Sequence, residues 1–546
     1  MQELNNPIRL PDDYYLTNFW RLVNGVTQRY QDLLCPDESE LIAVINQLST
    51  DAQKLYVRLL CRKGLDFRLD KLHYPEICDL KSALNELTET RLATTDAPDN
   101  WGTIGRLCTT AELKQLGHLQ GTFKKDRLLE QLSEHPIPEL PFTVITLHDS
   151  QWLSLFQLLY FNNPRQNLTD FVLSDLALKR YESYRLDKQT RLYQNRSQID
   201  LALKLALLNE QLDQLPKNGN WPIAHLLEQL PQHTEHPTLE RQSQRIREKL
   251  AREYERRSEF EIALTNYQAC DSVFSRERQC RIWIKTDPEK ALQQLQKIAC
   301  NPTNLNEQQF ASNLYFRLAR KLKRPATEPK SVHYKRIDWP APQIQGAPEQ
   351  SALLQLKTLG WQGVHCENAL INGILTLTLW PALFADHLPG VFFHPFQHRP
   401  ADLYHPDFFS KRQPLINTLL DEINHPNWTR QIKSRFKHKY GLENPLFDWN
   451  RLPQDVLNIA LERVPAPIWQ CIFDYQLFDL RQTRAGMPDL FIWNETQFGW
   501  LEIKGPGDKL QNNQLLWLDK LNELKLPVAV CYMGHQSVPS PTKITF

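Results

Sequence analysis

The sequence predicts a multidomain, mostly α-helical protein with an α/β domain at its carboxy-terminal end. The chain has 546 residues, and a prior of roughly 150 residues per domain suggests three or four units. Apolar residues recur at helical spacing from Tyr14 onward, and the stretches 250–270 and 281–299 look like repeated helix pairs. Short strand-like apolar runs become clear only beyond residue 338. We expect four regions, which are 1–100, 101–140, 141–338 and 339–546.

The charge and the cysteine content narrow the class of protein. Lys and Arg together number 64, and Asp and Glu number 63, so any nucleic-acid-binding surface has to come from local patches. The ten cysteines are scattered, with no C-x-x-C pair and no zinc-finger pattern, as in reduced intracellular proteins. No signal-peptide pattern and no apolar run of about 18 residues is present. We therefore expect a cytoplasmic protein with no membrane partner, nucleoid-associated if the protein is bacterial.

Region 1–100 is predicted to be helical and to bind DNA. Its first apolar residues repeat at spacings of three and four, which is typical of a buried helix face. In the next helical stretch, Lys54, Arg58 and Arg62 are four residues apart and share one side of the helix. This stripe is a candidate for phosphate contacts, and the alternative is an ordinary solvated face.

Region 101–140 contains a short basic helical hairpin, "LCTTAELKQLGHLQGTFKKDRLLEQL". Thr109 and Glu112 have the spacing of a capping box at the start of the first helix. Lys124, Lys125 and Arg127 lie together at the start of the second helix. The pattern resembles a SAP domain, a small module that binds the backbone of duplex DNA, and the resemblance implies that these three residues contact DNA. The alternative is a plain helical hairpin.

Region 141–338 is expected to be helical, with degenerate helix pairs that resemble tetratricopeptide repeats. Such repeats bury their apolar faces only by stacking on each other, so we expect a curved scaffold that holds a partner or a duplex. A Pro-rich segment, "WPAPQIQGAP", follows and predicts the boundary near residue 339.

Region 339–546 contains the segment with the clearest chemistry, "GMPDLFIWNETQFGWLEIKGPGDKLQNNQ". Two apolar runs separated by a turn predict a β-hairpin. Because alternate side chains of a strand share a face, Glu502 and Lys504 project together, and Asp489 at the mouth of the other strand can join them. Two carboxylates and the main-chain carbonyl of Ile503 form an all-oxygen set that suits Mg²⁺ or Mn²⁺. The alternative is a surface ion pair at the end of a sheet.

The chemistry that fits this site is hydrolysis of a phosphodiester. A divalent cation held by carboxylates stabilises the developing charge and activates water, and Lys504 would contact the phosphate or the attacking water. We expect Asp508 to cap a following helix, on whose apolar face Gln514 is the odd member. Gln514 is a candidate for orienting phosphate or water, and the alternative is a hydrogen-bonded core residue.

The residues just described resemble a known family. "GMPDLFIW" followed by "LEIKGPGDKL" resembles the VRR-Nuc branch of the PD-(D/E)xK nucleases. The helical stretches near the start of the chain, the SAP-like hairpin, the helix pairs and "DLYHPDFFSKRQPLI" occur in the order found in the Fanconi-associated nuclease family. The resemblance covers nearly the whole chain. It implies a structure-selective, Mn²⁺- or Mg²⁺-dependent nuclease that cuts near 5′ flaps, trims 5′ to 3′ and takes part in repair of interstrand crosslinks.

The resemblance also implies roles for individual residues. It assigns Asp489, Glu502 and the carbonyl of Ile503 as metal ligands and Lys504 as the catalytic lysine. The segment "WQGVHCENALINGILTLTLW" matches the position of a further acid, which points to Glu367. For His365, two residues earlier, a satisfied structural histidine is the favoured interpretation over a metal ligand. Basic residues that hold a downstream 5′ phosphate are matched by those in "DLRQTRAGMPD", which are Arg481 and Arg484.

Two departures from the family pattern matter for the prediction. Eukaryotic members have a basic residue just before the helix glutamine, where this chain has Asn513, and they begin with a zinc finger whose Cys/His set is absent from this sequence. The chain therefore resembles a shorter, bacterial-type form. Two other functions remain open, a non-catalytic DNA-binding repair scaffold and a Holliday-junction or single-strand nuclease on the same catalytic fold.

Overall fold

The computed structural model describes residues 11–121, 123–148, 151–166, 179–216, 221–328, 331–340, 344, 347–534 and 544. The chain forms two compact units. The first contains the described residues up to Arg180, with Arg185–Ala206 and Phe393–Phe396. The second contains Tyr181–Tyr184, Leu207–Phe392 and the described residues from Gln397 onward.

The first unit is mainly helical. Its helices are α1 (Tyr14–Tyr30), α2 (Pro36–Gln47), α3 (Thr50–Leu60), α4 (Leu80–Glu89), α5 (Trp101–Leu107), α6 (Thr110–Leu116), α7 (Lys125–Leu132), α8 (Gln151–Phe161) and the beginning of α10 (Arg196–Gln214). The predicted buried face at the start of the chain is confirmed, because Phe19, Leu22 and Val26 on α1 are almost completely inaccessible to solvent.

A small sheet in the first unit was not predicted. It contains β1 (Asp66–Arg68), β2 (Ala93–Thr94) and β3 (Val144–Leu147), in the antiparallel order β1-β3-β2. The amino-terminal part, which was expected to be helical, therefore also contains strands. Strands this short contain too few residues to give an alternating apolar pattern in the sequence.

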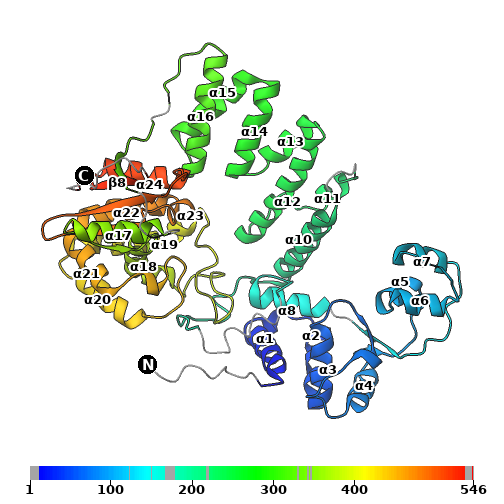
Figure 1. Cartoon of the computed structure of the whole chain (residues 1–546). Coiled ribbons are helices and arrows are strands. Elements are labelled where there is room, and N and C mark those ends of the chain that lie inside the picture. The colour runs from blue at the N-terminus through cyan, green and yellow to red at the C-terminus, as the bar shows by residue number, and fades with distance from the viewer. Residues whose placement is uncertain are drawn as a thin grey trace. The chain divides into compact units, whose positions relative to one another are not determined.

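The SAP-like hairpin is present as α6 and α7, and α5 packs with them (Figure 1). Trp101, Leu113 and Leu128 belong to the small apolar core that the three helices share. Thr109 and Glu112 form the predicted capping box at the start of α6. The local sequence signals therefore identified both helices of this hairpin.

The second unit begins with stacked helices. They are the end of α10, α11 (Ala224–Glu228), α12 (Pro237–Arg256), α13 (Phe260–Gln268), α14 (Val273–Thr286), α15 (Pro288–Cys300) and α16 (Leu305–Lys321). Consecutive helices from α12 to α16 pack against each other, as Figure 1 shows. The predicted helix pairs coincide with α12–α13 and α14–α15.

A mixed five-stranded sheet forms the centre of the carboxy-terminal part. Its strands are β4 (Lys335–Trp339), β5 (Gln362–His365), β6 (Leu490–Trp493), β7 (Phe498–Lys504) and β8 (Val528–Met533), in the order β4-β8-β7-β6-β5. The two pairings of β8, with β4 and with β7, are parallel, whereas β6 pairs antiparallel with β7 and with β5. The predicted hairpin is the β6–β7 pair, and the mostly helical class with a carboxy-terminal mixed sheet is confirmed.

The predicted boundary between residues 338 and 339 falls inside β4. All five residues of this strand pair with β8. The Pro-rich segment that predicted the boundary therefore does not mark the start of the sheet, which is determined by main-chain hydrogen bonds. We propose that the carboxy-terminal domain begins at or before Lys335.

Helices surround this sheet. They are α17 (Pro348–Thr358), α18 (Ala369–Leu383), α19 (Phe408–Asp421), α20 (Trp428–Lys439), α21 (Gln454–Arg463), α22 (Ala466–Phe478), α23 (Leu480–Thr483) and α24 (Asn512–Glu523). The prediction that Asp508 caps the last helix is wrong. Asp508 accepts a hydrogen bond from the main chain of Gly505, and Gln511 caps α24 instead. None of the helices in the described ranges has both the length and the apolar character needed to cross a membrane.

Helix α18 is buried on nearly all sides and contains a proline, which removes one helical hydrogen bond. Pro381 has no N–H to offer the carbonyl of Leu377, four residues earlier. The guanidinium of Arg435 on α20 donates to this carbonyl and to the carbonyl of Thr378, both at 3.0 Å. A side chain from a neighbouring helix therefore satisfies the carbonyl that the proline leaves without a donor.

We expect Arg435→Met to lower the free energy of unfolding by about 2 kcal/mol, because a charged donor is lost and a buried carbonyl loses its partner. Urea unfolding followed by tryptophan fluorescence measures this loss. Arg430→Met, on the exposed side of the same helix, is the control and should change stability little. Equal stability of the two variants would show that Arg435 does not stabilise α18.

Candidate active site

The mouth of the β6–β7 hairpin brings two acidic side chains together. Leu490 lies opposite Leu501 in the ladder, so Asp489 and Glu502 occupy the next pair of positions. Leu490 and Leu501 point into the core of the domain, and because side chains alternate along a strand, the two acids lie on the opposite face. Only 8% of Asp489 and 1% of Glu502 remain exposed.

Glu502, Lys504 and Gln514 form a closed triangle of polar contacts. The Lys504 ammonium lies 2.8 Å from Oε1 of Glu502 and donates to Oε1 of Gln514 at 3.0 Å. The Gln514 amide donates in turn to Oε1 of Glu502 at 2.6 Å. Oε1 of Gln514 also accepts from the main-chain N–H of Gln511, which fixes the amide at the start of α24. The structure brings together the predicted acid, lysine and glutamine.

Asp489 is fixed by the main chain of the neighbouring strand. Its Oδ2 accepts a hydrogen bond from the N–H of Ile503 at 2.7 Å. The N–H and the C=O of one residue in a strand point to the same side, so the carbonyl of Ile503 is directed toward the same edge as Asp489. The carbonyl of Asp489 accepts from the N–H of Cys366 at 3.0 Å, which ties the end of β5 to the same point.

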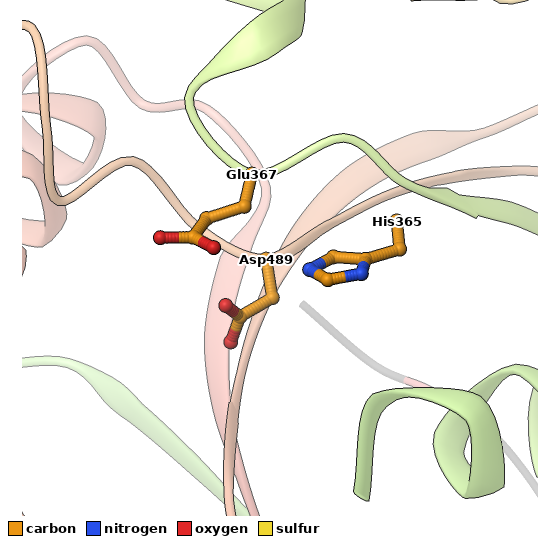
Figure 2. Close-up of side chains that lie close together, drawn as sticks. All are labelled: His365, Glu367 and Asp489. Carbon is orange, nitrogen blue, oxygen red and sulfur yellow. The ribbon is translucent and has the colours of Figure 1, made fainter. Parts of the chain in front are cut away.

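The turn after β5 adds two more side chains to the cluster. His365 is the last residue of β5, and Glu367 lies two residues later. One possible ligand atom from each of His365, Glu367 and Asp489 lies within 4.8 Å of the other two. Figure 2 shows the three side chains together, with the imidazole ring directed toward Asp489. The expectation of a satisfied structural histidine is wrong, because His365 is exposed at the rim of this cluster. Its exposure follows from its place on the edge strand β5.

Burial and mutual repulsion make the acids hard to ionise. Burial raises the pKa of Asp489 to about 6, and the charge of Glu367 adds to this effect. Burial and then the charge of Asp489 raise the pKa of Glu502 to about 8, although Lys504 opposes the shift. Three carboxylates therefore face one ammonium group. This donor set fits a divalent cation, because hard oxygen ligands with excess negative charge are what such ions prefer.

The predicted arginines gather around one aromatic ring. The guanidinium groups of Arg481 and Arg484 lie 5.8 and 5.3 Å from the centre of the Tyr404 ring, and that of Arg399 lies 5.0 Å from it. None of these three arginines forms a salt bridge with any residue that the structure describes. The charge of Arg481 acts on nearby Asp479, and the three guanidinium groups around one ring form a surface suited to an anion.

A cavity of about 310 Å³ adjoins this ring. Tyr404 and Arg481 line it, together with Arg241, Arg245 and His405. Arg241 is paired with Asp407, whereas Arg245 is exposed on the same face of α12. The cavity therefore offers cationic walls beside an aromatic surface.

The predicted basic residues of the SAP-like hairpin differ from each other in the structure. Lys124 and Arg127 are exposed. Lys125 is partly buried, and its ammonium group donates to the carbonyl of Cys108 at 2.8 Å. Lys125 therefore closes the hairpin, and Lys124 and Arg127 are the two side chains that face solvent.

The stripe of Lys54, Arg58 and Arg62 on and beyond α3 is largely occupied by contacts within the unit. Arg58 forms a salt bridge with Glu76 at 2.6 Å, and Lys54 donates to the main-chain carbonyl of Glu76. Arg62 donates to the hydroxyl of Tyr74. These contacts favour a structural role over the predicted phosphate contacts.

Three residues near the site were missed in the sequence. Glu349, in the first turn of α17, adds negative charge that raises the pKa of Asp489 after burial and Glu367 have done so. Tyr404 gathers the arginines, and Asn368 donates to Glu367 at 2.9 Å. Only Asn368 left a signal, since an asparagine directly before a helix is common at the start of α-helices.

We expect the binding of a divalent cation such as Mn²⁺ to release protons at pH 7. At that pH Glu502, with a pKa near 8, is mostly protonated, and ligation requires the carboxylate. The release should approach about one proton per cation at pH 7 and vanish near pH 9, while the affinity for the cation rises with pH. Titration calorimetry in buffers of different ionisation enthalpy measures the release. A proton count that does not change between pH 7 and pH 9 would contradict the raised pKa of Glu502, and Glu502→Gln is the control that should release none.

Comparison with known proteins identifies the family. Two family models match, the FAN1, HTH domain over residues 13–94 and the VRR-NUC domain over residues 426–534. A Fanconi-associated nuclease 1 homolog from Pseudomonas aeruginosa is 32% identical over 550 residues, which is 97% of each chain. Fanconi-associated nuclease 1 from Homo sapiens is 23% identical over 95% of this chain, which spans 62% of the length of the human protein.

Solved structures give the same result. The crystal structure of paFAN1 bound to 2nt 5′flap DNA with gap matches with a TM-score of 0.82 and 30% identity, over 96% of this chain and 99% of that chain. The structure of paFAN1 bound to 1nt 5′flap DNA with gap matches with a TM-score of 0.80 and 31% identity, with the same coverage of both chains. Because the similarity extends over nearly the whole of both chains, this chain belongs to the Fanconi-associated nuclease family and is a DNA-hydrolysing nuclease with a VRR-NUC domain.

Proposed function

We propose that this protein is a structure-selective, metal-dependent nuclease that cuts DNA near 5′ flaps and trims 5′ to 3′ during DNA repair, including repair of interstrand crosslinks. The observation that carries the proposal is the buried cluster at the mouth of β6 and β7, where Asp489 and Glu502 face each other beside Lys504. The match to paFAN1 bound to 5′-flap DNA supports the substrate.

In this proposal Glu367, Asp489, Glu502 and the carbonyl of Ile503 hold Mn²⁺ or Mg²⁺, and His365 lies close enough to join them. The bound ion would stabilise negative charge on the phosphate and lower the pKa of a bound water. The hydrogen bond from the N–H of Ile503 to Asp489 favours the ionised carboxylate and fixes its direction.

Lys504 and Gln514 act on the phosphate side of the cluster. The ammonium group of Lys504 can contact a phosphate oxygen or the attacking water, where a fixed positive charge stabilises the transition state. Gln514 keeps Lys504 and Glu502 in place, because its amide bonds to both of them. We therefore propose a catalytic role for Lys504 and an orienting role for Gln514.

We propose that Arg481 and Arg484 bind a 5′ phosphate of the DNA. This chain has Asn513 at the position where eukaryotic members of the family have a basic residue. Asn513 packs closely on Gly486, and a Cβ atom added to Gly486 would lie 2.7 Å from Asn513. The missing charge is offset by Arg399 and Arg245, which lie around the same ring and cavity. A planar guanidinium suits phosphate oxygens.

The amino-terminal regions are proposed to bind the duplex. Regions 1–100 and 101–140 would contact the DNA backbone, with Lys124 and Arg127 as solvent-facing cations of the SAP-like hairpin. Region 141–338 would support the duplex, and the domain of 339–546, extended to include β4, would cut it. Such phosphate contacts make binding weaker as salt is raised.

We expect Asp489→Asn to reduce cutting of a labelled 5′ flap in Mn²⁺ by about 1000-fold, equivalent to roughly 4 kcal/mol of transition-state stabilisation. The experiment compares 5′-flap, 3′-flap, four-way and single-stranded DNA, with a gel assay for cutting and a mobility-shift assay for binding. DNA binding should persist in the variant. Asp455→Asn, on an exposed helix end, is the matched control and should cut normally.

The other outcomes of that experiment separate the alternatives. No cutting by either protein would favour a DNA-binding scaffold. Preferential cutting of the four-way junction would reject flap selectivity, and undiminished cutting by Asp489→Asn would remove this cluster from the reaction.

The ring of Tyr404 provides a test of the phosphate site. Tyr404→Leu should reduce the preference for 5′-phosphorylated over 5′-hydroxyl flaps by about fivefold, equivalent to a cation–π contribution of about 1 kcal/mol. Tyr404→Phe keeps the aromatic face and should keep the preference. The ratio of kcat/KM for the two flaps measures the effect, and equal ratios in the Leu and Phe variants would show that the ring does not organise the arginines.

A further inference from the structure

Asn368 connects the two chain segments that bear the acids. Its side-chain amide donates to Oε1 of Glu367 at 2.9 Å, and its Oδ1 accepts from the N–H of Met487 at 3.1 Å. Met487 lies two residues before Asp489. A single side chain therefore bonds to Glu367 and to the segment that leads into Asp489.

The conformation of Asn368 indicates that this bridging is its role. The residue has φ of 57°, a left-handed conformation that asparagine adopts more readily than most residues. It directly precedes α18, yet its side chain does not cap the helix. The N–H groups of Ala369 and Leu370 are bonded to the carbonyl of Cys366 instead. The side chain of Asn368 therefore does not cap α18, and its amide donates a hydrogen bond to Glu367 instead.

Glu367 needs such a restraint more than the other acids do. Its side chain is 38% exposed, and besides Asn368 it contacts the guanidinium group of Arg451, at a distance of 3.9 Å. Ordering a long glutamate side chain costs conformational entropy. A hydrogen bond that already restricts the side chain in the metal-free protein reduces the cost of ligation.

A second asparagine on the same helix gives a useful contrast. Asn372 lies one turn further along α18, donates to the carbonyl of Arg484 at 2.8 Å and accepts from Gln476 at 2.9 Å. It is fully buried and holds the same loop. The hydrogen bonds of Asn372 do not involve Glu367, so it supports the loop without restraining the acid.

We propose that Asn368 is a positioning residue that holds the carboxylate of Glu367 beside Asp489, so that both acids can bind the same divalent cation. The inference rests on the metal site of the proposed function and goes beyond it, because it assigns the placement of Glu367 beside Asp489 to a residue outside the proposed set of metal ligands. The positive φ and the two hydrogen bonds are the features that require asparagine at this position.

The test compares Asn368→Gly with Asn372→Ala. Glycine keeps the left-handed backbone and removes only the side chain. Titration of Mn²⁺ followed by electron paramagnetic resonance should show roughly tenfold weaker binding for Asn368→Gly, as for other groups that orient metal ligands. Its kcat for flap cutting should fall at saturating DNA, with KM for DNA and the melting temperature close to the parent values. Asn372→Ala should lower the melting temperature and leave Mn²⁺ affinity near that of the parent.

A double-mutant cycle with Glu367→Ala separates positioning from general structural support. If Asn368 acts through Glu367, removing Asn368 in the Glu367→Ala background changes Mn²⁺ affinity no further. Additive losses would overturn the inference, as would parent-like Mn²⁺ affinity of Asn368→Gly. Failure of the parent itself to bind Mn²⁺ would count against the metal site, and therefore against the proposed function as well as this inference.

Discussion

The antiparallel register of β6 and β7 determines where the acids of the candidate active site lie. Because Leu490 and Leu501 face each other and enter the core, the next pair, Asp489 and Glu502, lies on the other face at the point where β6 begins. A slip of either strand by one residue would turn its acid toward the apolar core and its leucine toward the other face, on which Phe491 and Trp500 are buried. The apolar core thus fixes the carboxylates indirectly, and Lys504 follows from the same alternation two residues along β7.

Helix α18 is the second support of the site. It is buried around nearly its whole circumference and packs against α19 and α20. The side chain of Asn372 on α18 donates a hydrogen bond to the carbonyl of Arg484. Arg435 on α20 donates to the α18 carbonyl that Pro381 leaves without a donor. The burial of α18 and the hydrogen bond from Asn372 to Arg484 tie the turn containing Glu367 to the loop that leads into β6.

Much of the site was predictable from the sequence because strand alternation is a local property. The pattern around Glu502 and Lys504 placed both on one face, and the odd polar residue on an apolar helix face, Gln514, is bonded to both. Predictions failed where contacts between distant segments decide. The exposure of His365 depends on β5 being an edge strand, and Lys125 is occupied by a carbonyl 17 residues away. Tyr404 lies beside Arg481 and Arg484, which are nearly 80 residues further along the chain, and no local pattern reports such a contact.

The distribution of charge around the site has a consequence for the order of binding. The acids at the mouth of the hairpin outnumber the single ammonium of Lys504, and their raised pKa values measure how unfavourable that charge is in the metal-free protein. In the proposed function, a DNA phosphate at this cluster would meet like charge until a cation is bound, whereas the arginines around Tyr404 carry the opposite charge with or without the cation. Binding a divalent cation removes both the repulsion among the acids and the repulsion of the substrate. Under the proposed function, the arginines would hold DNA before the metal is present, and the scissile phosphate would approach Asp489 favourably only after the cation has bound.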